Sequence, residues 1–140
     1  MKDDSRTRVL VTVSGPDHVG ITAEITRAIA DREARLLDLE QVVVQGQLTL
    51  CVLIGGLDVD AERTTMLDDL GARATKMGLD LRASVLRGVP DEHEDDNRRF
   101  AVTAIGDELG AKEISVIAGV LAGHGANIAS IRRLTDRGLG

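Results

Sequence analysis

Aromatic residues are almost absent from this sequence. Phe100 is the single aromatic residue among 140, and neither Trp nor Tyr occurs. A hydrophobic core must therefore be built from aliphatic side chains, which the 43% hydrophobic content can supply. The lack of aromatic rings also removes the stacking platforms that single-stranded nucleic acids need. A net charge of −6 further disfavours a phosphate backbone as partner, so we expect no nucleic-acid binding.

Cysteine and long apolar runs are also scarce. Cys51 stands alone in an apolar segment, which excludes a disulfide framework within the chain and a cysteine metal cluster. No apolar stretch approaches the roughly 18 residues that a membrane-spanning helix needs. The first residues, MKDDSRTR, are charged and lack the apolar centre of a signal peptide. These features predict a reduced, cytoplasmic setting and no membrane partner.

The pattern of apolar residues predicts an α+β fold. Alternating or short apolar runs mark strands, and apolar residues at i, i+4, i+7 and i+8 mark helices. The expected strands cover residues 8–14, 36–44, 48–54 and 80–86, and the expected helices cover 21–33 and 61–77. This βαββαβ order is the ferredoxin-like arrangement, with four antiparallel strands and both helices on one face. The other sheet face and the sheet edges are left for a partner.

An acidic segment follows this first domain, which we place at residues 8–86. Residues 87–98 contain one proline, five acidic residues and no apolar period, so they are predicted to be a linker. The pattern then restarts, with a strand expected at 99–106, a helix around 114–121 and a strand at 127–136. The repeats are offset by about 92 residues, and the second, residues 99–140, is a partial βαβ domain. We expect a partner chain to complete it, or else poor order.

The turn GPDHVG, residues 15–20, joins the first strand to the first helix. This layout suits an anion, because free N–H groups at a helix start attract carboxylates and phosphates. Neither glycine-rich nucleotide motif is present, so a small zwitterion fits better than a nucleotide. Its ammonium group could meet Asp17 or Asp38, the available carboxylates. The alternative is that Asp17 caps the helix and the glycines only make the turn.

The βαββαβ repeat, the GPDHVG loop and the string LLDLEQVVVQGQLTLCVLI resemble an ACT domain, a small-molecule-sensing module of amino-acid metabolism. The likeness covers residues 8–140, including GANIASIRRL in the second repeat. It is strongest to the tandem ACT region that precedes the catalytic domain in one bacterial type of phosphoserine phosphatase. The resemblance implies that an amino acid, L-serine or else glycine, binds at a joint between paired domains. It also implies a homodimer formed through ACT sheets or helices.

The resemblance further implies which residues contact the ligand: the first loop, and the second strand of a facing domain. The matching residues are Gly15, Asp17, His18, Val19, Gly20, Ile21, Asp38 and Glu40. Family members often carry Asn at the position of Asp38, so this contact differs in charge here. The corresponding loop of the second repeat, residues 106–111, lacks the Asp-x-x-Gly form. We therefore expect a weaker site there.

Arrangements of catalytic residues are not evident. Residues 58–62, DVDAE, resemble the Asp-x-Asp-x-Thr/Val motif of the family's phosphatase domain, in which one Asp attacks phosphorus and the next is the general acid. The fifth residue is Glu, and no Gly-Asp-x-x-Asn-Asp-type metal segment follows. Asp58 or Asp60 is therefore expected to cap the second helix, and His18, His93 and His124 are isolated. We expect this chain to have no catalytic activity, cofactor or metal, with Mg²⁺ belonging only to a separate phosphatase domain.

Two functions follow from these features. The first is the regulatory, serine-sensing and dimerising region of a phosphoserine phosphatase. The alternative is a stand-alone tandem-ACT regulator of the glycine-cleavage repressor type, which acts by contacting another protein. A plain dimerisation domain without a ligand is a third reading.

Overall fold

The computed structural model describes residues 7–87, 99–107 and 109–134. Contacts within the chain divide it into two units, residues 1–92 and residues 93–140. The expected linker at residues 87–98 lies almost wholly outside the described residues, so the predicted domain limits stay predictions. No helix in the described part of the chain is long and apolar enough to cross a membrane.

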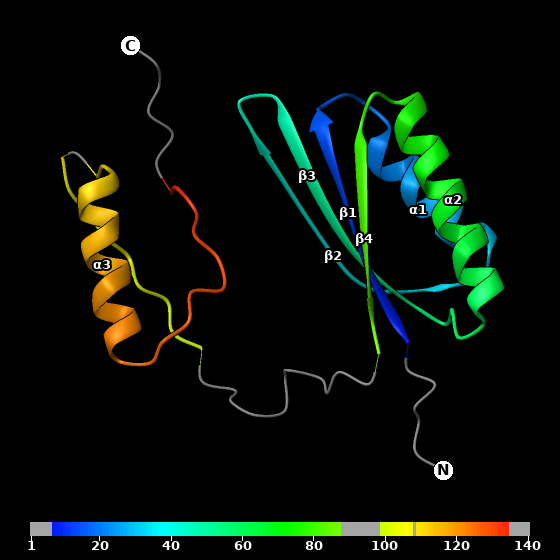
Figure 1. Ribbon diagram of the computed structural model, residues 1–140. Coiled ribbons are helices and arrows are strands. Elements are labelled where there is room, and N and C mark those ends of the chain that lie inside the picture. The colour runs from blue at the N-terminus through cyan, green and yellow to red at the C-terminus, as the bar shows by residue number, and fades with distance from the viewer. Residues whose placement is uncertain (1–6, 88–98, 108, 135–140) are drawn as a thin grey trace. The chain divides into compact units, whose positions relative to one another are not determined.

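The first unit has the expected βαββαβ order (Figure 1). Its strands are β1 (Arg8–Pro16), β2 (Arg35–Val44), β3 (Gln47–Gly55) and β4 (Asp80–Leu86), and its helices are α1 (Ile21–Asp31) and α2 (Asp60–Lys76). The strands form one antiparallel sheet in the order β2-β3-β1-β4. The predicted ferredoxin-like α+β fold is confirmed.

The core of this unit lies between the sheet and its two helices, which cover one face of the sheet (Figure 1). It is aliphatic, as the sequence predicts. Alternate residues of the two central strands are fully buried: Val9, Val11 and Val13 in β1, and Leu48, Leu50, Val52 and Ile54 in β3. The helices add Ile21, Ile25, Ala28, Ile29, Met66, Leu70 and Ala74. Because side chains alternate along a strand, the residues between these point to the face that carries no helix.

The second unit differs from the prediction. Among its described residues the regular element is one helix, α3 (Ala111–Gly123). The strands expected at 99–106 and 127–136 are not formed in the described residues 99–107 and 126–134. The first unit shows the physical reason, because β1 and β2 do not pair with each other: β3 lies between them and pairs with both. The described part of the second unit contains no counterpart of β3, so its two would-be strands have no partner.

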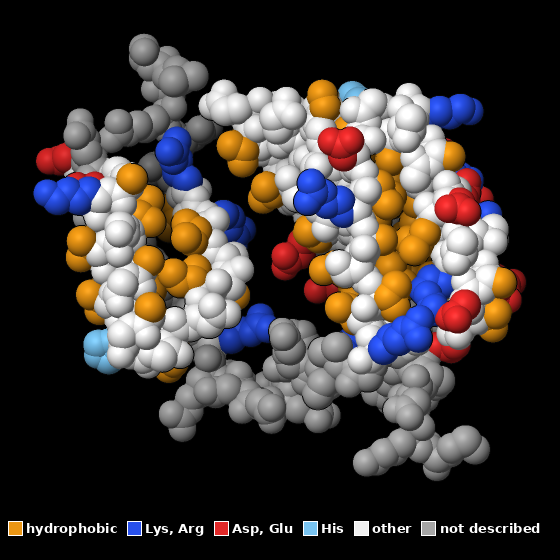
Figure 2. Space-filling model, in the orientation of Figure 1, with side chains coloured by type: hydrophobic (Ala, Val, Ile, Leu, Met, Phe, Trp, Pro, Cys, Tyr) orange, Lys and Arg blue, Asp and Glu red, His pale blue; other side chains and the backbone are white. Residues whose placement is uncertain are grey.

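The described residues of the second unit bury no hydrophobic side chain. Phe100 is 84% exposed, and Val116 on α3 is 61% exposed. Figure 2 shows hydrophobic side chains at the surface of the part that contains α3. The apolar stripe that predicts this helix is thus present, but no sheet in the described residues covers it.

Candidate functional site

The predicted ligand loop, residues 15–20, lies at the end of β1 against the turn between β2 and β3. The N–H of Asp17 donates to the carbonyl oxygen of Gly46 at 2.8 Å, which holds the loop to that turn. Gly15 and Gly20 have φ of +149° and +96°. A Cβ on Gly15 would lie only 2.7 Å from Cδ2 of Leu79, so packing as well as backbone conformation requires glycine there.

Helix α1 begins immediately after this loop and has no side-chain cap. Its N-cap is Gly20, whose carbonyl oxygen accepts the N–H of Glu24 at 3.0 Å. The alternative in which Asp17 caps this helix is therefore wrong. The physical reason is the left-handed conformation of Gly20, which places a residue without a side chain at the capping position. The positive end of the α1 dipole is thus left open beside the loop.

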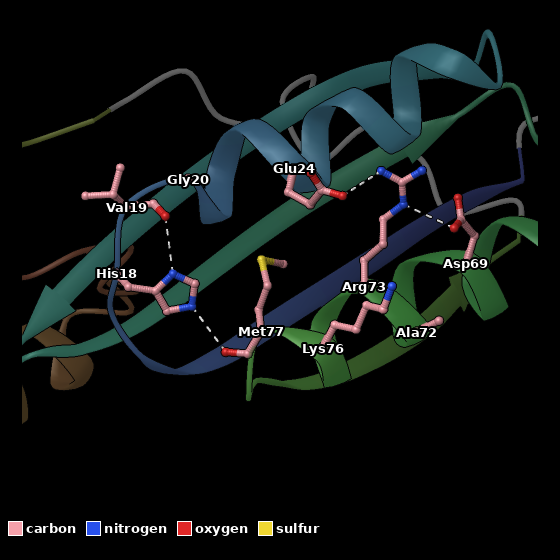
Figure 3. A pocket seen from close by; sticks show the side chains of 9 residues that line it. All are labelled: His18, Val19, Gly20, Glu24, Asp69, Ala72, Arg73, Lys76 and Met77. Carbon is pink, nitrogen blue, oxygen red and sulfur yellow. Dashed lines mark hydrogen bonds and ion pairs between the residues drawn. The ribbon is translucent and has the colours of Figure 1, made fainter.

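A cavity of about 610 Å³ lies between α1, the loop and the last turns of α2 (Figure 3). The loop contributes His18, Val19 and Gly20 to its wall, and the remaining lining residues are Glu24, Asp69, Ala72, Arg73, Lys76 and Met77. Local sequence pattern does not connect the residues of α2 with the loop, because they follow it by about fifty positions. The available signal was the spacing of Asp69, Arg73 and Lys76, which places three charges along one side of a helix.

His18 connects the loop to the end of α2. Its Nε2 lies 3.1 Å from the carbonyl oxygen of Met77, and its Nδ1 lies 3.3 Å from the carbonyl oxygen of Val19. Because carbonyl oxygens only accept hydrogen bonds, each of these contacts is a hydrogen bond when the ring nitrogen that makes it carries a proton. The side chain is exposed but not isolated, and it closes one end of the cavity (Figure 3).

Ion pairs between α1 and α2 form the other end of the cavity. Arg73 donates to Glu24 at 2.9 Å and to Asp69 at 3.1 Å, and Arg32 lies 3.5 Å from Asp69. The hydrogen bond to Asp69 is the largest cause that raises the pKa of Arg73, and the charge of Glu24 adds to it. Lys76 has no hydrogen-bond or ion-pair partner among the described residues, so the cavity keeps one uncompensated cation.

The structure does not bring Asp38 and Glu40 to this cavity. They pair with Leu53 and Cys51 of β3. The loop lies farther along the sheet, at the end where Gly15 pairs with Leu48. Both carboxylates are exposed on the sheet face opposite the helices. Within one unit they cannot contact a ligand held by the loop, and their expected role from a facing domain stays a prediction.

The start of α2 also differs from the expectation. Its N-cap is Val59, and no side chain caps it, so the prediction that Asp58 or Asp60 does so is wrong. Asp60 pairs instead with Arg63, because that residue is only 6% exposed and its guanidinium needs a counter-charge. Arg63 also donates to the carbonyl oxygen of Leu57 at 2.9 Å. These two interactions of Arg63 thus hold the turn before α2 to the first turn of the helix.

The other candidate residues form no reactive cluster. Cys51 is half-buried on the open sheet face, with Sγ 3.9 Å from Oγ1 of Thr12. Nδ1 of His124 lies 2.9 Å from the carbonyl oxygen of Val120 in the same helix. Over the described ranges, no three His, Cys, Asp or Glu side chains come close enough to hold a metal ion.

Comparison with known proteins agrees with the fold and the repeat. An ACT domain family profile matches residues 7–84, and a second ACT domain profile matches residues 99–139. The chain belongs to the ACT domain family. The predicted resemblance is therefore confirmed for both repeats, including the second one, whose strands are not paired here.

The curated relatives include two phosphoserine phosphatases. One, from Mycobacterium tuberculosis, is 34% identical to this ACT chain over 133 residues, which make up 94% of the chain and 32% of the relative. Another, from Streptomyces coelicolor, is 32% identical over 130 residues, or 90% of the chain and 30% of the relative. The chain thus spans about a third of the length of these relatives.

Solved structures share the fold at lower identity. A proposed glycine cleavage system transcriptional repressor superposes with a TM-score of 0.56 and 18% identity, over 62% of this chain and 50% of that one. An unknown protein from Galdieria sulphuraria has a TM-score of 0.55 and 18% identity, over 89% of this chain and 68% of that one. Likeness at this identity bears on the fold alone.

Proposed function

We propose that this ACT chain is the regulatory, amino-acid-binding region of a phosphoserine phosphatase, and that it works in the cytoplasm as a homodimer. The observation that carries the proposal is the likeness to phosphoserine phosphatases over 94% of the chain, which includes both ACT repeats. In this proposal the chain itself performs no catalysis and needs no cofactor. Mg²⁺ is required only by a catalytic domain elsewhere in the protein.

The ligand in this proposal is an amino acid, with serine preferred to glycine. Its carboxylate binds the uncapped start of α1 beside Gly20, where backbone N–H groups and the helix dipole favour negative charge. Its ammonium group contacts the carboxylate of Asp17 in the loop and that of Asp38 from a facing domain. The cavity lined by His18 and Val19 leaves room beside the loop for the side chain of the ligand.

Regulation follows from linkage. An amino acid bound at a joint between two domains stabilises the assembly that contains the joint, and by reciprocity the assembly raises the affinity for the amino acid. A change in the pairing of the regulatory regions then alters the attached enzyme. This mechanism needs no chemical step within the ACT chain.

A thermal-shift screen of the 140-residue chain against the twenty amino acids tests the proposal. A ligand present at about 100 times its dissociation constant stabilises the native state by about 2.7 kcal/mol. We expect serine to raise the melting temperature, and Asp17→Ala to abolish the rise. Asp68→Ala, an exposed acidic residue of α2 outside the cavity, is the matched control and keeps it. If no amino acid shifts the melting temperature, the ligand part of the proposal fails.

The reading frame after residue 140 tests the phosphatase part separately. We expect an Asp-x-Asp-x-Thr/Val segment that follows a strand, because this motif supplies the nucleophile and the general acid of the catalytic domain. A frame without it would overturn the phosphatase part and favour the stand-alone tandem-ACT regulator.

A further inference from the structure

The face of the first sheet that carries no helix has an ordered distribution of charge. Strand pairing aligns Glu40, Cys51, Thr12 and Arg82 in one row that crosses all four strands. The contact between Thr12 Oγ1 and Cys51 Sγ at 3.9 Å confirms that this row lies on one face. An acidic residue thus stands on one edge strand, β2, and a basic residue stands at the same level on the other edge strand, β4.

These two charges cannot neutralise each other within one copy. Three strand spacings separate β2 from β4, which places Glu40 and Arg82 about 14 Å apart. Both side chains are exposed, and neither has a partner among the described residues. Charges of opposite sign at equal levels on opposite edges are the pattern expected of a surface that binds a copy of itself.

The centre of the face permits close approach of another sheet. In the rows beside Thr12 and Cys51, β1 carries Leu10 and Ser14, and β3 carries Leu53 and Thr49. Such short and aliphatic side chains can pack between sheets about 10 Å apart. Leu10 is 36% exposed in the single copy, so a second layer would bury apolar area there.

We propose that a second copy of this chain covers the face, related by a two-fold axis that runs parallel to the strands. This axis places β2 of one copy over β4 of the other, so that Glu40 meets Arg82 twice in the dimer. It also places Leu10 over Leu53. Asp80, one row away from Arg82, then faces Val42 rather than a carboxylate.

The charge pattern selects this axis from the alternative. A two-fold axis perpendicular to the strands would place β2 of one copy on β2 of the other. Asp38 and Glu40 of both copies would then lie together, and repulsion between like charges would oppose the contact. The inference concerns a contact between copies that is separate from the joint at which the proposed ligand binds, because this axis keeps Asp38 of the second copy at the level of Leu10 rather than of the loop. It does not depend on amino-acid binding, so it is tested without ligand.

Charge reversal in the 140-residue chain, followed by sedimentation equilibrium, tests the geometry. We expect wild-type protein to dimerise, and Glu40→Arg and Arg82→Glu each to raise the dimer dissociation constant about tenfold or more, since each change opposes like charges twice. An equal mixture of the two variants restores dimerisation as a heterodimer, because both pairs become attractive again. Native mass spectrometry distinguishes this heterodimer by mass. Asp68→Arg, on α2, is the matched control and leaves the dissociation constant unchanged.

Two outcomes would overturn the inference. A wild-type chain that stays monomeric at all concentrations means that no second copy covers the face. Variants that dimerise as well as wild type mean that the copies associate through another surface, such as the β2 edge. Either result leaves the amino-acid screen, and hence the ligand part of the proposed function, unaffected.

Discussion

The imidazole Nε2 of His18 lies 3.1 Å from the carbonyl oxygen of Met77, although the two residues are 59 positions apart. This hydrogen bond joins the loop after β1 to the end of α2. Because of this contact, the loop forms one wall of the cavity between α1 and α2. The position of the loop therefore depends on a helix that comes much later in the chain.

We predict that His18→Ala weakens both the fold and the binding of an amino acid. Loss of one neutral hydrogen bond should lower the free energy of unfolding by about 1 kcal/mol. The freed loop should also raise the ligand dissociation constant several-fold. Urea denaturation followed by far-ultraviolet circular dichroism measures the first effect, and isothermal titration calorimetry measures the second. His124→Ala, whose ring bonds to the carbonyl oxygen of Val120 in the second repeat, is the control for binding and should leave the ligand dissociation constant unchanged.

The two glycines Gly15 and Gly71 should respond to alanine with opposite signs. At Gly15, φ is +149° and a Cβ would lie 2.7 Å from Leu79, so Gly15→Ala should destabilise the fold by about 1–3 kcal/mol. Gly71 lies inside α2 with no atom within 4 Å of its added Cβ, so Gly71→Ala should stabilise by about 1 kcal/mol. Thermal denaturation of both variants measures the difference. Equal effects would show that loop conformation does not constrain Gly15.

The buried cation Arg63, in the first turn of α2, should contribute measurably to stability. Arg63→Met removes the bonds to Asp60 and to the carbonyl oxygen of Leu57, and leaves that oxygen without its donor. We expect a loss of about 1–3 kcal/mol in the free energy of unfolding. Arg35→Met, at an exposed position without a partner among the described residues, should change it by about 0.5 kcal/mol or less. A neutral Arg63→Met would contradict the role assigned to this side chain.

Hydrogen exchange should separate the two repeats. Amides of β1 and β3, paired on both sides in the sheet, should exchange slowly. Amides in residues 99–107 and 126–134, which have no strand partner, should exchange rapidly in the 140-residue chain. Mass spectrometry of peptic fragments measures both. Slow exchange in the second set would mean that another strand pairs with them in solution, as the sequence analysis expected of a partner chain.

Local sequence pattern was sufficient to predict the helices and strands of the first repeat, because each of them buries one face. The alternating apolar residues of β1 are the ones that the core buries. The same holds for the apolar stripe of α1, which consists of Ile21, Ile25, Ala28 and Ile29. The same reasoning failed for the strands of the second repeat. Alternation shows that a segment is suited to a sheet, but a strand forms only where a neighbour supplies its hydrogen bonds.

The candidate site divides in the same way. The glycines Gly15 and Gly20 predict a tight loop, because a backbone with positive φ favours glycine. The structure has the loop at these positions, and both glycines have positive φ. The alternative in which Asp17 caps a helix was wrong, and so was the cap expected from Asp58 or Asp60, since a side chain near a helix start does not have to bond to it. The contributions of Glu24, Asp69, Arg73 and Lys76 follow from the packing of α1 against α2, which local pattern does not contain.

The sequence by itself determined the order of elements in the first repeat, its aliphatic core, the glycine loop and membership of the ACT family. Each of these features depends on residues that are close together in the chain, or on motifs that can be recognised in the sequence alone. Only the tertiary structure decided which side chains meet. It joined His18 to Met77 and Arg73 to Glu24, and it separated Asp38 from the loop. Such contacts depend on the strand order β2-β3-β1-β4 and on helix packing, which bring together residues that no local pattern relates.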